Sequence, residues 1–242
     1  MPERHQQSRF ETTRWNVVLA AGSTGTAASR DALSVLCEQY WYPLYVYLRR
    51  SGHRAIEAED LVQGFFLRLL EKGALHAADP RRGRFRSFLL AALKHFVANE
   101  WDRSRAEKRG GVNPPVAFEV SAGERRYRLE PHDDCTPETL YERQWARTVL
   151  HRTTARLRAE LRDAQKEHLF HQLEPYLTPD ADAPPYAELA AASGMTEGAV
   201  KVAVYRLRRR YRDLLRDEIA ETVASPEELQ DEIHHLISIA GA

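Results

Sequence analysis

The sequence contains few of the residues that support cross-links, metal centres or membrane insertion. Only two cysteines occur, Cys37 and Cys135, and they belong to no spaced metal motif. No apolar run approaches the roughly 20 residues of a membrane span. The N-terminal stretch MPERHQQSRF lacks the apolar core of a signal peptide. We therefore expect free thiols in a reducing compartment, and a soluble, cytoplasmic protein that does not bind a membrane.

Motifs typical of enzymes are also missing. The chain has no glycine-rich phosphate loop, no nucleophile elbow and no HExxH pair. His168 and His171 lie three residues apart, but no third metal ligand is near them in the sequence. We therefore expect no catalytic residues, no metal and no cofactor, and we expect that the protein is not an enzyme.

The chain also lacks net charge, because 35 Lys and Arg residues balance 35 Asp and Glu residues. Any binding of nucleic acid must therefore come from local basic patches. Apolar residues make up 43% of the 242 residues, which can supply the core of one large domain or two small ones.

Apolar residues recur at helical spacing along most of the chain, and no segment predicts a strand convincingly. A short helix is expected near Trp15, and Pro43 should kink or split the helix that follows. Aromatic side chains cluster in this second helix. They could stack on bases, but their spacing favours packing in the core. Longer helices are predicted over about 29–50, 56–72, 85–108, 137–161, 166–173 and from 225 onwards.

The stretch from Tyr186 to Arg216 predicts two helices joined by a tight turn. Gly194 suits the turn because it adopts positive φ, and Thr196 can cap the second helix. One face of that helix is apolar, and the other carries Lys201, Arg206, Arg208, Arg209, Arg210 and Arg212. This pattern predicts a helix-turn-helix whose second helix fits the DNA major groove, although an arginine-rich helix can also be only a solvated surface.

A second basic patch covers 81–109, with nine Lys or Arg residues against three acids and with aromatic residues between them. This mixture suits single-stranded nucleic acid, because cations meet phosphates while rings stack on bases. Residues 110–136 contain Gly-Gly and Pro-Pro pairs without a clear period, which predicts a linker. After Arg216 the chain is acidic and contains no Lys or Arg.

We therefore expect an all-α protein with two helical domains joined by a flexible linker, the second domain containing the helix-turn-helix. The predicted ranges are 12–109 for the first domain, 110–136 for the linker, 137–220 for the second domain and 221–242 for an acidic helical extension. Because charge is so segregated, the acidic linker and extension could shield the basic patches.

Three segments in this order resemble the extracytoplasmic-function class of sigma-70-type RNA polymerase sigma factors. AEDLVQGFFLRLLEKG at 58–73 is similar to the family's polymerase-docking helix. RGRFRSFLLAALKHFVANEWDRSRAEKR resembles its −10 melting segment, and YAELAAASGMTEGAVKVAVYRLRRRYR resembles its −35 reader. The chain looks closest to long, planctomycete-type members with an extra acidic C-terminal helix.

The resemblance implies roles for individual residues. Asp60 and Gln63 match positions that dock on the clamp helices of the polymerase β′ subunit, although Gly64 stands where the family often has an acid. The loop 79–84 matches the one that captures a flipped base of the −10 element. His95 stands where many members carry Asn. The residues implied to contact the −10 DNA are Arg84, Arg86, Lys94, His95, Asn99, Arg103, Arg105 and Lys108.

In the −35 reader, relatives often carry Ser-Arg where this chain has Val202-Ala203. This difference predicts that the −35 bases are recognised through methyl contacts and through Lys201. The arginines are then expected to bind phosphates. The residues implied at −35 are Thr196, Glu197, Lys201, Val202, Tyr205, Arg206, Arg208 and Arg209.

The implied partners are core RNA polymerase, through the β′ clamp helices and the β subunit, and promoter DNA. A regulator such as an anti-sigma factor is a further candidate partner. One alternative is a dimeric helix-turn-helix regulator that binds duplex DNA without polymerase, which would leave 81–109 unused. Another is a helical enzyme or scaffold whose basic faces bind a different partner.

Overall fold

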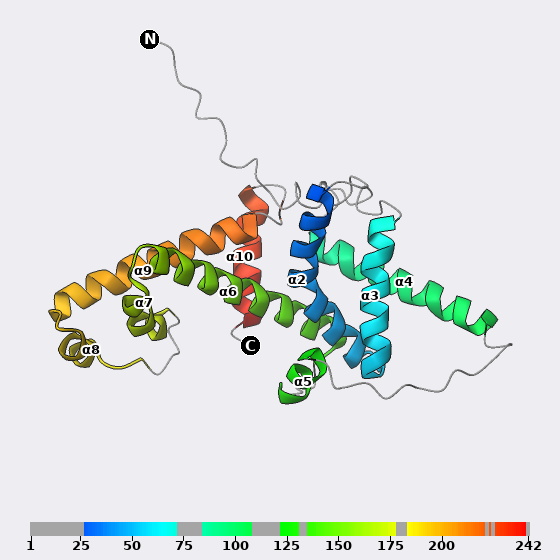
Figure 1. The fold of residues 1–242 in the computed structure, drawn as a ribbon, viewed down its shortest axis with the longest axis horizontal. Coiled ribbons are helices and arrows are strands. Elements are labelled where there is room, and N and C mark those ends of the chain that lie inside the picture. Colours follow the sequence, from blue (N-terminus) through cyan, green and yellow to red (C-terminus); the bar gives the residue numbers. More distant parts are fainter. Residues whose placement is uncertain are drawn as a thin grey trace, which may run out of the picture. The chain divides into compact units, whose positions relative to one another are not determined.

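The computed structural model describes residues 27–71, 84–107, 122–130, 135–177, 183–220, 223 and 226–240. Every regular element in these ranges is a helix, which confirms the all-α prediction for the described part of the chain (Figure 1). The short helix expected near Trp15 lies outside the described residues. The elements are α2 (Ala27–Arg50), α3 (Ala55–Glu71), α4 (Phe85–Glu107), α5 (Ala122–Leu129), α6 (Pro137–Asp163), α7 (Glu167–Leu173), the 3₁₀ turn η3 (Glu174–Tyr176), α8 (Tyr186–Ser193), α9 (Glu197–Ala220) and α10 (Pro226–Ala240).

The chain divides into two compact units. Unit 1 contains the chain up to Arg147 and again from Ala220 onwards, and unit 2 contains Thr148–Ile219. The division therefore falls inside α6, C-terminal to the predicted linker at 110–136. Unit 1 includes α10, so the last helix and the first helices belong to the same unit.

A tight turn connects α2 and α3, the two helices that pack most extensively in unit 1. Gly52 in this turn has a φ of 97°, and the His53 N–H donates to the Leu48 carbonyl at 3.1 Å. This left-handed C-cap explains why a glycine follows the helix. Pro43 does not split α2, which continues through it to Arg50.

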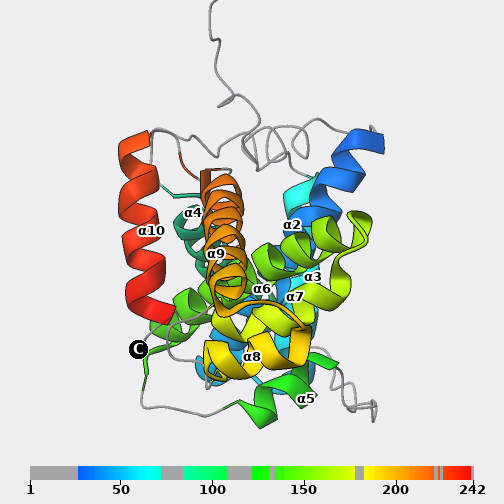
Figure 2. The ribbon, with the colours of Figure 1, turned by 90° about the vertical axis from the view of Figure 1, so that its left-hand side faces the viewer.

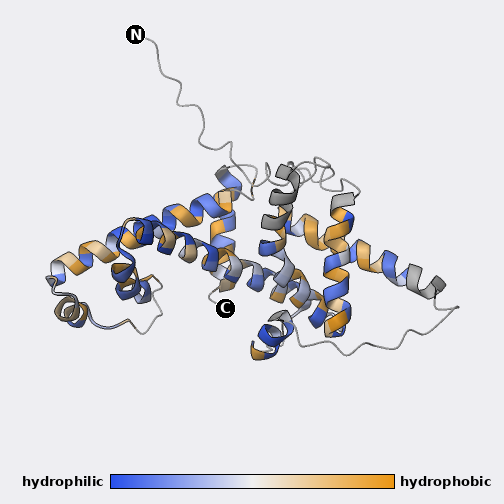
Figure 3. Cartoon of the chain, in the orientation of Figure 1, coloured by the Kyte–Doolittle hydropathy of each residue, from blue (hydrophilic) through white to orange (hydrophobic). Residues whose placement is uncertain are grey.

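Aromatic side chains from several helices fill the core of unit 1. Tyr40 and Tyr45 of α2, Phe85 of α4, and Tyr141 and Trp145 of α6 are all at most 2% exposed. The rings of Tyr40 and Phe85 meet edge to face, with centroids 5.5 Å apart. The aromatic cluster of α2 therefore contributes to the core, as its spacing predicted, and Figure 3 shows how hydrophobic and hydrophilic residues alternate along these helices.

Helix α5 lies within the segment predicted to be a linker, and nothing in the sequence periodicity indicated it. Its Glu124 is only 3% exposed. The Tyr45 hydroxyl donates to Glu124 Oε2 at 2.6 Å, and Arg49 Nε donates to the same oxygen at 3.0 Å. These contacts attach α5 to α2. Tertiary ion pairing therefore orders a short, polar helix that has little apolar surface of its own.

Unit 2 is built around a small core of its own. Leu157 of α6, Phe170 and Leu173 of α7, Leu189 of α8 and Val204 of α9 pack together there. Helix α8 supplies only eight residues, two of them buried, while α9 contributes a long apolar stripe. The core therefore fixes α8 against α9, and Figure 2 shows α8 in the foreground at the start of α9.

The turn between α8 and α9 has the geometry that the sequence predicted. Gly194 adopts a φ of 68°, and the Met195 N–H donates to the Ala190 carbonyl at 3.1 Å. Thr196 Oγ1 accepts a hydrogen bond from the Ala199 N–H at 3.2 Å, which caps α9. The predicted glycine turn and threonine cap are both confirmed.

Candidate functional site

The outer face of α3 brings the two predicted polymerase-docking residues together. Asp60 and Gln63 are both exposed. Ile56 and Leu67 continue the same helical face at spacings of four residues, and they are 44% and 59% exposed. The opposite face of α3 is buried through Ala58, Val62, Phe65, Phe66 and Leu69. Asp60 and Gln63 therefore lie on a solvent-facing stripe that also offers two large apolar side chains.

Gly64 has a packing role that the sequence did not reveal. A Cβ at this position would come within 3.3 Å of Phe96 Cζ on α4, and Phe96 is 8% exposed. The missing side chain therefore lets the Phe96 ring approach the backbone of α3. The close contact between α3 and α4 gives a physical reason for glycine at this position.

Helix α4 carries the predicted −10 residues Lys94, His95 and Asn99, and all three are exposed. His95 and Asn99 line a groove of about 430 Å³ between α3 and α4, whose walls are mainly apolar. Lys94 donates to Glu138 of α6 at 2.7 Å, and this hydrogen bond raises the pKa of Lys94 and lowers that of Glu138. His95 and Asn99 thus share one exposed face of α4, whereas Lys94 lines a separate groove with Tyr47 and Trp101.

Other predicted −10 residues lie outside the described part of the chain. Arg103 and Arg105 fall on α4, but the structure does not describe their side chains. Lys108 and residues 79–83 of the predicted base-capturing loop are likewise outside the described residues.

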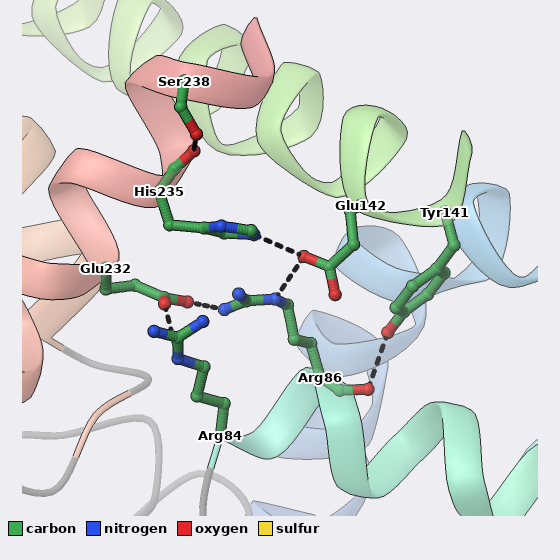
Figure 4. A network of polar contacts seen from close by, with 7 residues as sticks. All are labelled: Arg84, Arg86, Tyr141, Glu142, Glu232, His235 and Ser238. Carbon is green, nitrogen blue, oxygen red and sulfur yellow. Dashed lines mark hydrogen bonds and ion pairs between the residues drawn. The ribbon is translucent and has the colours of Figure 1, made fainter. Parts of the chain in front are cut away.

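Arg84 and Arg86 are engaged inside unit 1 (Figure 4). Arg86 is 3% exposed and is stacked over the Trp145 ring, at 4.2 Å from its centroid. Its Nε donates to Glu142 Oε2 at 2.6 Å, and its Nη1 contacts Glu232 Oε1. Arg84 Nε lies 2.9 Å from Glu232 Oε2. Arg86, predicted to contact DNA, is thus a buried residue in this structure.

The network around Arg86 extends to α10 and to the backbone. His235 Nε2 lies 3.1 Å from Glu142 Oε2, and the Tyr141 hydroxyl donates to the Arg86 carbonyl at 3.0 Å. Burial lowers the pKa of Arg86, while the charge of Glu142 acts in the opposite direction. Sequence reasoning missed Glu142, Glu232 and His235. The only related signal was the acidic character of the C-terminal extension.

The outer face of α9 carries most of the predicted −35 residues. Glu197, Lys201, Val202, Tyr205, Arg206 and Arg209 are exposed together with Thr196, and Val202 and Tyr205 are 49% and 60% exposed. Ala203 packs against the core of unit 2. Of the Val202-Ala203 pair, Val202 is therefore the exposed member.

Two basic residues of α9 are anchored within unit 2. Arg208 Nε donates to the Tyr176 carbonyl at 2.6 Å, so this half-buried guanidinium holds η3 beside α9. Arg210 Nε and Nη2 donate to Glu160 at 2.8 and 2.6 Å, and this pairing lowers the pKa of Glu160. Lys201 lies 2.7 Å from Glu197, with both side chains more than half exposed, and a single ion pair at such a position holds a lysine only weakly.

Among the helices that the structure describes, none combines the length and apolar character needed to cross a membrane. Within the same described ranges, no group of three or more His, Cys, Asp or Glu residues is placed to hold a metal ion.

Comparison with known proteins identifies a family match. Residues 36–107 match the family model described as Sigma-70 region 2, a segment that runs from within α2 through α3 to the end of α4. No curated protein and no solved structure matches the chain. The matched segment contains Asp60 and Gln63 of α3 and the exposed polar residues of α4. This match supports a protein of the sigma-70 family.

Proposed function

We propose that this protein is an RNA polymerase sigma factor of the extracytoplasmic-function type. It binds core polymerase and directs recognition of the −35 and −10 promoter elements, DNA melting and initiation. The observation that carries the proposal is the region 2 match over 36–107, together with the exposure of Asp60 and Gln63 inside it. A sigma-70 region 2 supports a sigma factor in general, and the arrangement of side chains supports the finer assignment.

The outer face of α3 suits a docking helix. Asp60 offers a charge and Gln63 an amide, while Ile56 and Leu67 offer exposed apolar surface on either side of them. Interfaces gain most of their affinity from a few side chains that are desolvated at the centre of the contact. We infer that all four residues contact the β′ clamp helices, with the β subunit as a further contact of the bound chain.

The exposed polar residues of α4 support the −10 role. His95 and Asn99 are exposed beside an apolar groove between α3 and α4, and Lys94 is exposed at a second groove of the same helix. Phosphates can pair with the lysine while an unstacked base contacts the groove, which is the general mode of single-strand binding. Trp101 is 56% exposed on the same helix and adds an aromatic surface.

Helices α8 and α9 support the −35 role as a helix-turn-helix. The exposed start of α9 carries Lys201, Val202 and Tyr205, which can reach base edges in a major groove. Lys201 must leave Glu197 to do so, at little cost for an exposed pair. The Val202 methyl groups favour contact with a thymine methyl, and Arg206 and Arg209 hold phosphates.

A reconstituted transcription reaction tests the proposed function. Purified chain, core RNA polymerase and a library of promoter fragments should give promoter-dependent runoff transcripts. Binding of duplex DNA without polymerase, and no transcript with it, would instead support the dimeric helix-turn-helix regulator. If the chain neither binds duplex DNA nor initiates transcription, both the sigma-factor and the regulator hypotheses are wrong, and the protein is a scaffold or a helical enzyme instead.

The docking assignment has a sharper test. Because Asp60 and Gln63 are exposed, Asp60→Ala and Gln63→Ala should leave the melting temperature unchanged and weaken binding to core polymerase by roughly 10-fold or more each, as expected for central interface residues. Pull-down with immobilised core enzyme measures this. Asp231→Ala, an exposed acid on α10, is the matched control and should bind like the wild type. If all three variants bind core polymerase with equal affinity, α3 is not the docking helix.

A further inference from the structure

One face of α10 places a carboxylate between two leucines. Leu229, Glu232 and Leu236 follow one another at spacings of three and four residues, and all are buried, at 4%, 0% and 1% exposure. A glutamate is almost never fully buried unless it is paired. Helix α10 belongs to unit 1, and Glu232 must therefore find positive partners there.

Its partners are two arginines at the start of α4, within the predicted DNA-melting segment. Glu232 Oε2 lies 2.9 Å from Arg84 Nε, and Glu232 Oε1 contacts Arg86 Nη1. The Arg84 side chain keeps 36% of its surface exposed, whereas those of Arg86 and Glu232 keep 3% and 1%. A single carboxylate from the C-terminal helix thus joins both guanidiniums (Figure 4).

A guanidinium binds a carboxylate and a phosphate through the same planar set of N–H donors. The donors of Arg86 that face Glu232 and Glu142 are therefore withdrawn from any phosphate, and Glu232 neutralises Arg84 at the surface beside it. In this arrangement the start of α4 presents less positive charge to DNA than its sequence contains.

We propose that α10 is an intramolecular lock in which Glu232 takes the place of a DNA phosphate at Arg84 and Arg86. Single-stranded promoter DNA, the ligand that the proposed function assigns to this segment, must displace Glu232 before its phosphates reach these arginines. This proposal rests on the proposed function and adds a regulatory step to it, the displacement of Glu232 before DNA binds. The chemistry of the lock itself requires only a nucleic-acid strand that binds at the start of α4.

The test compares two charge-matched variants of the full chain. Glu232→Gln removes the negative charge from the network, and Asp231→Asn removes the same charge from the neighbouring exposed position. A fluorescein-labelled single-stranded oligonucleotide reports affinity by anisotropy. We expect Glu232→Gln to bind it roughly 5- to 150-fold more tightly, the usual range for coupled sites, and Asp231→Asn to match the wild type. Unchanged or weaker binding by a folded Glu232→Gln chain overturns the lock.

A second measurement uses the wild-type chain and does not depend on how the variant folds. If DNA displaces Glu232, amides of α10 should exchange with deuterium faster when the oligonucleotide is saturating. Unchanged or slower exchange in α10 overturns the proposal. Adding Arg84→Gln to the Glu232→Gln chain should abolish the gain in affinity, and a gain that persists would also contradict the lock.

Runoff transcription separates failure of the lock from failure of the proposed function. If the wild type initiates with core polymerase while Glu232→Gln changes neither oligonucleotide affinity nor the amount of transcript, the lock is wrong and the sigma assignment stands. If Glu232→Gln binds the oligonucleotide more tightly but no variant initiates transcription, the lock stands and the sigma assignment is wrong.

Discussion

At the scale of single residues, Glu124 connects α5 to α2 through charge. It accepts hydrogen bonds from Tyr45 at 2.6 Å, from Arg49 at 3.0 Å and from Arg128 at 2.8 Å. Burial alone would raise the pKa of Glu124, but the hydrogen bonds from Tyr45, Arg128 and Arg49 lower it below the ordinary value of 4.5. The ionised carboxylate is therefore favoured in the folded protein.

This depressed pKa predicts how unit 1 responds to acid. A carboxylate whose pKa is lower when folded contributes stability at pH values above its unfolded pKa, and that contribution is lost as pH falls through the folded value. The wild type should therefore lose free energy of unfolding below about pH 4.5. Glu124→Gln should be less stable near pH 7 and should show a shallower loss in acid. Urea unfolding at a series of pH values measures both effects, and parallel curves for the two proteins would contradict the assignment.

Residue roles could be predicted from the sequence where they are local. Thr136 caps α6, with its Oγ1 accepting from the Thr139 N–H at 3.2 Å, and Thr196 caps α9 in the same way. Each cap depends on residues three positions away. The burial of Arg86 depends on Glu142 and Glu232, which lie far along the chain, so the local sequence did not indicate it.

At the scale of elements, two glycines near the start of α9 form a matched pair. A Cβ would meet nothing within 4 Å at either Gly194 or Gly198, but Gly194 has a φ of 68°. We expect Gly194→Ala to lower the stability of unit 2 by about 1–2 kcal/mol because of the left-handed backbone. Gly198→Ala should be neutral or stabilising by up to about 1 kcal/mol. Denaturant unfolding of both variants checks this, and equal effects would show that φ is not the cause.

Prediction of elements succeeded where an apolar stripe was long. Helices α3, α4, α6 and α9 agree closely with their expected ranges because each buries a periodic face. Helix α5 was missed because it is eight residues long, and its Leu129 is 86% exposed. Contacts of Glu124 and of Arg126, which lies 3.8 Å from the centroid of the Tyr42 ring, hold it in place, and such contacts leave no periodic signal.

At the scale of the whole molecule, unit 1 is assembled from both ends of the chain. Removing residues 223–242 would take away Leu229 and Leu236 and leave Arg86 with Glu142 as a remaining carboxylate partner. We expect this truncation to destabilise unit 1 by about 3 kcal/mol or more, the usual cost of breaking a buried ion pair. Hydrogen exchange should accelerate in α4 while α7 and α8 of unit 2 keep their rates. Equal acceleration in both units, or none, would contradict the division into units.

The sequence could not place this division because nothing local marks it. The acidic extension was expected as a separate element at 221–242, yet the structure includes it in unit 1 through α10. The match to sigma-70 region 2 at 36–107 covers the first helices of that unit and stops well before α10.

The return of α10 to unit 1 also sets an order of events during synthesis. Unit 2 ends at Ile219, so all its residues are made before Glu232. Arg147 and Glu232 are 85 positions apart, and at about 5–20 residues per second the ribosome needs on the order of ten seconds to cover that distance. During this interval Arg84 and Arg86 have no Glu232 to pair with. Until Glu232 is made, Arg86 has Glu142 as a carboxylate partner while Arg84 lacks its Glu232 contact, and the proposed lock forms only after α10 has been synthesised.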